Sequence, residues 1–179
     1  SRGMRYLHKC GIIHRDLKSS NILIGPNLGI CNTRIRLLTT ETEVKLCDFG
    51  LSRVLDDTTM TKSIGAVAWV APEVYTSRGE YTEKSDVYSF GIVLWELLTR
   101  KQPFANYQSM QVPIMVTKGE RPPLEKNCPL DWKTLICKCW HKRPQQRPTF
   151  PLITRHIRQM KLTSVRIFTY RLFLMRLTY

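Results

Sequence analysis

The sequence predicts a mainly α-helical domain that carries a few short strands. Residues 83–99 are apolar on every face of a helix, which is typical of a helix buried inside a domain. Helical spacing recurs in three later segments: from about residue 108, over residues 130–140 and over residues 150–162. A buried central helix needs other helices around it, so the domain is mainly α. Two apolar stretches, residues 22–24 and 44–47, indicate short strands beside a polar loop.

Size and composition indicate one domain with a hydrophobic core. The chain has 179 residues and 42% of them are hydrophobic, so wholesale disorder is not expected. It has no signal-peptide pattern and no uninterrupted run of 18 apolar residues, so we expect a cytoplasmic chain without a transmembrane helix. The first residue is Ser1 rather than Met, so we expect a fragment of a longer protein. Nothing marks the chain as secreted, so its six cysteines are interpreted as reduced thiols rather than disulfides.

The first elements follow one another closely along the chain. Residues 2–10 have the spacing of a helix, and Gly11 ends it. Residues 12–13 form an apolar step into a polar loop, residues 14–21. Residues 25–27 have the composition of a turn.

The middle of the chain contains a loop and the start of the buried helix. Residues 52–64 are polar, rich in hydroxyl groups and without period, so we expect a mobile loop. Residues 71–73 begin a new turn. In the buried helix Ser85 is the expected N-cap, and Asp86 in the first turn suits the helix dipole.

The formal net charge of +14 is concentrated toward the C-terminal end. From Lys133 onward there are eleven Lys or Arg and no Asp or Glu. Such a block can bind nucleic acid or an anionic membrane, or it can be a solvated surface. No helix-turn-helix or aromatic-basic motif is present, so a nucleic-acid partner is not expected. Residues 163–179 combine arginines with large apolar side chains, and a poorly ordered terminus and a membrane contact both remain open.

The polar loop and the residues after the second strand have the chemistry that phosphoryl transfer requires. That reaction needs little covalent help but much positioning and charge neutralisation. Asp16 is a carboxylate that can sit beside an attacking hydroxyl, and Lys18 is a cation on the same side of an extended loop. Asn21 and Asp48 supply the oxygen ligands that Mg²⁺ prefers.

These stretches resemble motifs of the eukaryotic protein kinases. Residues 14–21, HRDLKSSN, match the catalytic loop H-R-D-L-x-x-x-N, and residues 48–50 and 71–73 match D-F-G and A-P-E in the family's order. The resemblance covers about residues 2–162. It implies the C-terminal lobe of a protein kinase, mainly α with a short β-hairpin region at the catalytic cleft. We therefore expect a partial kinase domain at residues 1–162 and a basic, apolar tail at residues 163–179.

The resemblance implies an enzyme that transfers the γ-phosphate of ATP, with Mg²⁺, to a protein substrate. Its catalytic residues would be Asp16, as the base, and Lys18. The residues implied to bind nucleotide or metal are Lys18, Asn21, Leu23, Cys47 and Asp48, with Mg²⁺ at Asn21 and Asp48. The residues implied to order the site are Arg15, Thr58, Thr59, Glu73, Asp86 and Arg147. Among these, Asp86 would hold the catalytic-loop backbone and Arg147 would pair with Glu73. Thr58 or Thr59, in an activation loop at residues 56–63, would be phosphorylated and contact Arg15.

The motifs also indicate a kinase group. Lys18 follows the serine/threonine-kinase pattern of the catalytic loop. Residues 69–73, 85–91 and 139–140 are similar to tyrosine kinases. This combination is typical of the tyrosine-kinase-like group, which includes the mixed-lineage and Raf kinases, and it implies serine/threonine specificity.

The sequence departs from the family in several places. It contains no Gly-rich loop, no strand lysine of the V-A-I-K type and no αC glutamate, so the N-lobe is expected to be missing and the chain alone to be inactive. Lys45 is expected to face solvent, and the apolar surface around Leu23 and Cys47 to be open. An alternative function is a catalytically silent module that binds other kinases or regulatory proteins.

Two further departures concern loops. Residues 25–43 are longer than the family's link between the two strands, and they are either a surface excursion or a gene-model error. Ala66 stands where most serine/threonine kinases have a hydroxyl residue that ties the substrate-binding loop to the catalytic Asp and Lys. Alanine cannot make that contact.

Overall fold

The computed structural model describes residues 1–25, 43–48, 53–54, 67–76 and 81–160 of the chain. Helices dominate this part, as the sequence predicts. The helices are α1 (Arg2–Lys9), α2 (Pro72–Thr76), α3 (Glu83–Thr99), α4 (Gln111–Lys118), α5 (Leu130–Cys139) and α6 (Phe150–Gln159). The strands are β1 (Ile12–Ile13), β2 (Ile22–Gly25), β3 (Glu43–Leu46) and β4 (Arg53–Val54). Short 3₁₀ helices lie at Ser19–Asn21, Val67–Trp69 and Pro144–Gln146.

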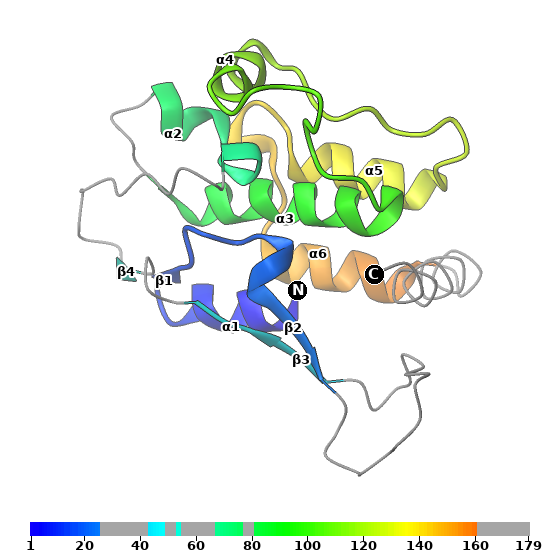
Figure 1. Cartoon of the computed structure of the whole chain (residues 1–179). Coiled ribbons are helices and arrows are strands. Elements are labelled where there is room, and N and C mark those ends of the chain that lie inside the picture. The colour runs from blue at the N-terminus through cyan, green and yellow to red at the C-terminus, as the bar shows by residue number, and fades with distance from the viewer. Residues whose placement is uncertain (26–42, 49–52, 55–66, 77–80, 161–179) are drawn as a thin grey trace.

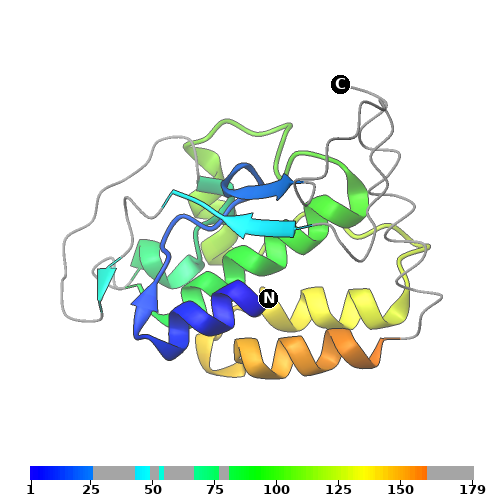
Figure 2. The ribbon, with the colours of Figure 1, turned by 90° about the horizontal axis from the view of Figure 1, so that it is seen from below.

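Helix α3 is the centre of the fold. Figures 1 and 2 show it running through the middle of the molecule, with α5 beside it and with α1 and α6 side by side. Thirteen of its 17 residues are buried, which confirms the prediction from its all-round apolar sequence. Ile92, for example, is fully buried, and burial of such a side chain contributes ~1.5–3 kcal/mol. Of the helices in the described ranges, none is both long and apolar enough to cross a membrane.

The start of α3 differs from the expectation. The prediction that Ser85 is the N-cap is wrong, because Thr82 takes that position with an extended backbone (φ −128°, ψ 171°). The Thr82 hydroxyl accepts from the Lys84 N–H at 3.2 Å, and the Ser85 hydroxyl accepts from the Thr82 N–H at 3.1 Å. This reciprocal capping box satisfies donors that the first turn of a helix would otherwise leave unpaired.

Helices α3 and α5 approach closely at a glycine. A Cβ placed on Gly91 would lie 2.9 Å from the Cys139 Cβ and 3.1 Å from the Trp140 nitrogen. Real Cβ atoms do not come so close, so the small residue sets the distance between the two helices.

The strands form two small antiparallel pairs. β2 pairs with β3, with Ile22 opposite Leu46 and Leu23 opposite Lys45, which agrees with the two predicted strands. Leu46 lies against Gly3 of α1, whereas Leu23 is 53% exposed. β1 pairs with β4, and β4 falls where the sequence predicted only a loop. Two residues are too short a stretch to show a strand period.

Several expectations lie outside the described residues and stay predictions. They concern the activation loop with Thr58 and Thr59, Ala66, the glycine of D-F-G, most of the 25–43 segment and the 163–179 tail. Lys45 is exposed, as the sequence predicted.

Candidate active site

Asp86, in the first turn of α3, holds the start of the predicted catalytic loop. Its Oδ2 accepts from the His14 N–H at 2.9 Å, and its Oδ1 accepts from the Arg15 N–H at 3.0 Å. His8 of α1 also places its Nε2 2.8 Å from Oδ2. Asp86 is 1% exposed, so one buried carboxylate joins α1, the loop and α3. A buried carboxylate is tolerated only when its oxygens are hydrogen-bonded in this way.

Two residues beside the site have strained backbones. Arg15 (φ 68°) and Asp48 (φ 62°) both adopt the left-handed conformation, which costs a non-glycine residue ~1–3 kcal/mol. The Asp86 carboxylate fixes the Arg15 backbone, and the Arg15 guanidinium lies 5.7 Å from the centre of the Tyr81 ring. Strain of this kind persists only where the surroundings over-determine the conformation, and it clusters at functional sites.

Asp16, Lys18 and Asn21 form one hydrogen-bonded group. Lys18 Nζ donates to Asp16 Oδ2 at 2.6 Å. The Asn21 amide nitrogen donates to the same oxygen at 3.1 Å and to the Asp16 carbonyl at 2.8 Å. Asp16 is 7% exposed, so its carboxylate is presented by two side-chain donors in a largely buried position. The structure thus brings together three residues that the sequence singled out.

Asp48 follows the end of β3 and comes directly after Cys47, whose backbone contacts this group. The Cys47 N–H donates to the Asn21 carbonyl at 3.0 Å, so the residue that follows Cys47 emerges beside Asn21. Asp48 is exposed, and the Asn21 amide nitrogen faces Asp16. A carboxylate and the amide oxygen of Asn21 are hard oxygen donors, so these residues fit a magnesium ion. Leu23 lies opposite Lys45 on the outer side of the same strand pair, with Cys47 two residues further on.

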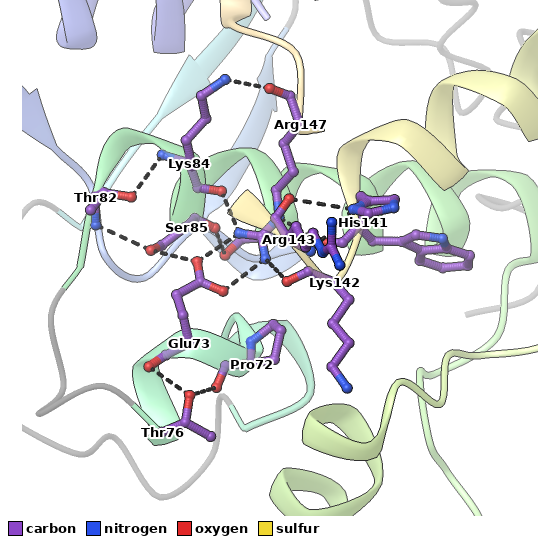
Figure 3. Close-up of polar contacts among 12 residues, drawn as sticks. Pro72, Glu73, Thr76, Thr82, Lys84, Ser85, His141, Lys142, Arg143 and Arg147 are labelled. Atoms are coloured by element: carbon purple, nitrogen blue, oxygen red, sulfur yellow. Dashed lines mark hydrogen bonds and ion pairs between the residues drawn. The ribbon is translucent and has the colours of Figure 1, made fainter. Parts of the chain in front are cut away.

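A second polar cluster joins α2, the first turn of α3 and the segment that contains Arg147. Arg147 donates to both oxygens of Glu73, from Nη1 at 2.6 Å and from Nη2 at 2.7 Å, as Figure 3 shows. The pairing expected from the sequence is therefore present. The Arg147 side chain is 0% exposed and that of Glu73 is 15% exposed. Ser85 donates to Glu73 Oε1 at 3.1 Å, so the capping box of α3 continues into the ion pair.

The remaining Arg147 donors meet backbone carbonyls. Nε donates to the His141 carbonyl at 2.8 Å, and Nη1 also donates to the Lys84 carbonyl at 2.9 Å. Nη2 approaches the Lys142 carbonyl at 3.4 Å, and Lys84 Nζ in turn donates to the Arg147 carbonyl (Figure 3). A guanidinium with this many partners is a fully satisfied buried charge.

Tyr88 completes this cluster and was not predicted from the sequence. Its ring lies between two guanidinium groups, with Arg121 5.0 Å and Arg147 5.2 Å from the ring centre. Burial raises the pKa of Tyr88 to about 12, although the two arginines act in the opposite direction. The phenol is therefore neutral, and the ring supports both cations through cation–π contact. The sequence predicted only an apolar position in the helix, because the two arginines are far from Tyr88 in the chain.

Glu96 is a further polar residue that sequence reasoning missed. Its Oε1 accepts from the Ser19 hydroxyl at 2.9 Å, and its Oε2 accepts from the Trp69 indole N–H at 2.7 Å. Burial raises the pKa of Glu96, and the two hydrogen bonds only partly offset this effect. The carboxylate thus links the predicted catalytic loop to the segment before residues 71–73.

Comparison with known proteins places these motifs in a family. Residues 1–157 match the family described as protein tyrosine and serine/threonine kinase. The match covers the catalytic loop, the Asp86 contacts and the Glu73–Arg147 pair.

Three curated relatives from Dictyostelium discoideum illustrate the similarity. The RGS domain-containing serine/threonine-protein kinase A is 44% identical over 165 residues, which are 92% of this chain and 13% of the relative. A "probable LIM domain-containing serine/threonine-protein kinase" is 41% identical over 151 residues, 84% of this chain and 21% of the relative. A "probable serine/threonine-protein kinase" is 43% identical over 152 residues, 84% of this chain and 15% of the relative. The chain therefore spans between 13% and 21% of the length of these relatives.

Proposed function

The chain belongs to the family of protein tyrosine and serine/threonine kinases, and on this premise we propose that it supplies the catalytic loop for phosphorylation of a protein substrate. The phosphate donor would be ATP, and the acceptors would be serine and threonine hydroxyls. The observation that carries the proposal is the Asp16–Lys18–Asn21 group, held beside Asp48 by a backbone that Asp86 anchors. In the proposed site, Asp16 would supply the carboxylate, Lys18 the cation, and Asn21 and Asp48 the oxygen ligands.

Asp16 is the proposed catalytic base. Its carboxylate accepts the proton of the substrate hydroxyl while that oxygen forms its bond to the γ-phosphorus, and the bond to ADP breaks. Hydrogen bonds from Lys18 and Asn21 orient the carboxylate before the substrate arrives. Positioning of this kind is the main contribution a kinase makes, because the transferred phosphoryl group needs little covalent help.

The negative charge of the ATP phosphates would be neutralised by Lys18 and by Mg²⁺ held at Asn21 and Asp48. Lys18 Nζ is 2.6 Å from Asp16 and can exchange this contact for a phosphate oxygen. Asn21 and Asp48 would hold Mg²⁺, which neutralises charge on the phosphates when bound. Leu23 lies on β2, and Cys47 lies between the end of β3 and Asp48; both would contact the nucleotide base.

The proposed specificity for serine and threonine is supported by Lys18 and by the printed names of the relatives. Each of the three relatives described above is named a serine/threonine-protein kinase. We further propose membership of the tyrosine-kinase-like group, because residues 69–73 and 85–91 are similar to tyrosine kinases while the catalytic loop is not. Phosphoamino-acid analysis of a protein substrate tests this, using the chain joined to the kinase N-lobe of a Dictyostelium relative. Phosphotyrosine as the main product would contradict it.

We also propose that the chain does not transfer phosphate by itself. A kinase needs a strand lysine on the nucleotide phosphates paired with a helix glutamate, and the sequence contains no segment of that type. Lys45, the lysine on β3, is exposed and lies opposite Leu23, which makes it a poor substitute. Incubation of the chain with labelled ATP, Mg²⁺ and a basic protein should give no labelled product. Transfer that the Asp48→Ala variant abolishes would overturn this proposal.

A further inference from the structure

Glu96 contacts two segments that are about fifty residues apart in the chain. Its two carboxylate oxygens are used separately, Oε1 by the Ser19 hydroxyl and Oε2 by the Trp69 indole N–H. Ser19 directly follows Lys18 in the catalytic loop, and Trp69 ends the 3₁₀ helix that precedes residues 71–73. One side chain of α3 therefore touches both segments.

The Trp69 segment is attached to α3 at a second point. The Ser89 hydroxyl donates to the Trp69 carbonyl at 2.8 Å. Ser89 and Glu96 are seven residues apart, so they lie two turns apart on one face of the helix. Ser89 holds the backbone carbonyl of Trp69, whereas Glu96 holds its indole. Of these two contacts, the one through Glu96 extends to the catalytic loop at Ser19.

The ionised form of Glu96 is destabilised by burial, although packing of the helix does not require a carboxylate at this position. Because burial raises the pKa of Glu96, the ionised carboxylate is less favourable here than in water. Both donors are neutral, so within the described part of the chain no ion pair compensates the charge. An ordinary apolar residue would be easier to bury at this position. The carboxylate instead provides two hydrogen-bond acceptors on the buried helix α3.

We propose that Glu96 is a positioning residue that fixes the catalytic loop at Ser19 to the segment at Trp69. The inference rests on the proposed function, in which the first segment carries the catalytic base and the second leads from the substrate-binding loop. When both segments are hydrogen-bonded to the same side chain, the distance between the catalytic base and the substrate-binding segment varies less. Small displacements matter in such a site, because the acceptor hydroxyl must lie within hydrogen-bond reach of the base.

The chemistry of the bridge predicts which replacements preserve it. A glutamine at position 96 has a carbonyl oxygen for the Trp69 indole, which can only donate. Its amide group can then donate to the Ser19 hydroxyl, which accepts as readily as it donates. Leucine has a similar volume and offers neither atom. The Glu96→Gln variant should therefore retain the bridge, and the Glu96→Leu variant should lose it without leaving a large cavity.

The experiment measures the indole N–H signals of the full chain by ¹⁵N-labelled NMR. The Trp69→Phe variant assigns the Trp69 signal, and the Trp95 indole, which donates to the Pro123 carbonyl at 2.9 Å, is an internal reference. In Glu96→Leu the Trp69 signal should move upfield and its hydrogen exchange should accelerate about tenfold or more, as expected when a hydrogen bond to a charged group is lost. In Glu96→Gln the chemical shift of the Trp69 indole and its hydrogen-exchange rate should both stay close to the wild-type values. The exposed Glu120→Gln variant is the matched control.

The decisive comparison is the Ser19→Ala variant. If Glu96 couples the two segments, removal of the Ser19 hydroxyl should shift the Trp69 signal, and this effect should vanish in the Glu96→Leu background. A Ser19→Ala chain with an unchanged Trp69 signal would overturn the proposal, and so would a Glu96→Gln chain that behaves like Glu96→Leu. If Glu96→Leu fails to fold, Ser19→Ala still decides the outcome. These readouts do not involve phosphotransfer, so they can fail or succeed separately from the proposed function.

Discussion

The ion pair of Glu73 and Arg147 allows a quantitative test of what holds this domain together. The change is Glu73→Gln, which removes the negative charge but keeps the shape of the side chain. Arg147 is then left as a buried cation without its counter-ion, since its side chain is 0% exposed. Gln can still accept one hydrogen bond, so one of the two contacts, at 2.6 and 2.7 Å, loses its acceptor.

The magnitude follows from the burial of the pair. Removal of one partner from a buried ion pair costs ~3–5 kcal/mol of unfolding free energy. The Glu73 side chain is 15% exposed and three backbone carbonyls still contact Arg147, so the lower end of that range applies. For a domain of this size ~1 kcal/mol corresponds to ~2–4 °C in Tm, so a loss of ~3 kcal/mol lowers Tm by ~6–12 °C.

The assay is thermal and urea unfolding followed by circular dichroism at pH 7. The matched control is Lys101→Ala, which removes an ion pair to Glu125 at 3.5 Å whose side chains are 67% and 40% exposed. An exposed pair contributes ~0–1 kcal/mol, so the Tm and the unfolding free energy of this variant should stay close to those of the parent. A Glu73→Gln variant that unfolds at the same temperature as Lys101→Ala would show that the buried pair contributes no more to stability than the exposed pair. The double variant Glu73→Leu/Arg147→Met should recover much of the loss, because no unpaired charge remains buried.

Three further predictions concern α3 and its neighbours. Gly91→Ala should cost ~1–3 kcal/mol in urea unfolding, because its Cβ would lie 2.9 Å from that of Cys139, and a variant as stable as the parent would contradict this close approach. Asp86→Asn should speed the exchange of the His14 and Arg15 amides, since Asn replaces one of the two accepting oxygens with an amide nitrogen, which only donates; unchanged exchange would count against Asp86 as the anchor of the loop. Cys139 should resist Ellman's reagent at pH 8 while exposed Cys137 reacts, because burial raises the pKa of the Cys139 thiol to about 12; equal labelling of the native chain would contradict it.

The helices and the catalytic loop could be predicted from the sequence because their signals are local. Residues 83–99 are apolar on every face of a helix, and this pattern alone predicts burial. In the loop, Lys18 and Asn21 both contact Asp16, and the three residues fall within six positions of the chain. Glu73 and Arg147 are 74 positions apart, and only the family resemblance paired them.

Other features had no local signal. Glu96 meets residues 77 and 27 positions away, and Tyr88 stacks between arginines from later segments, so neither role is visible in nearby residues. The N-cap of α3 was misplaced because Thr82 and Ser85 both carry hydroxyls. Thr82 is the N-cap because its backbone is extended, and the sequence does not show which of the two residues has that conformation.

Asp16 is the proposed base of the phosphotransfer reaction. The most direct test measures phosphotransfer by the chain joined to the N-lobe of a Dictyostelium relative, comparing Asp16→Asn with Ser20→Ala, an exposed residue of the same loop. We expect Asp16→Asn to lower kcat about a hundredfold or more, because a general base is lost, while urea unfolding of this variant and the rate of Ser20→Ala stay near the parent values. Phosphotransfer by Asp16→Asn within a factor of a few of the parent would contradict it.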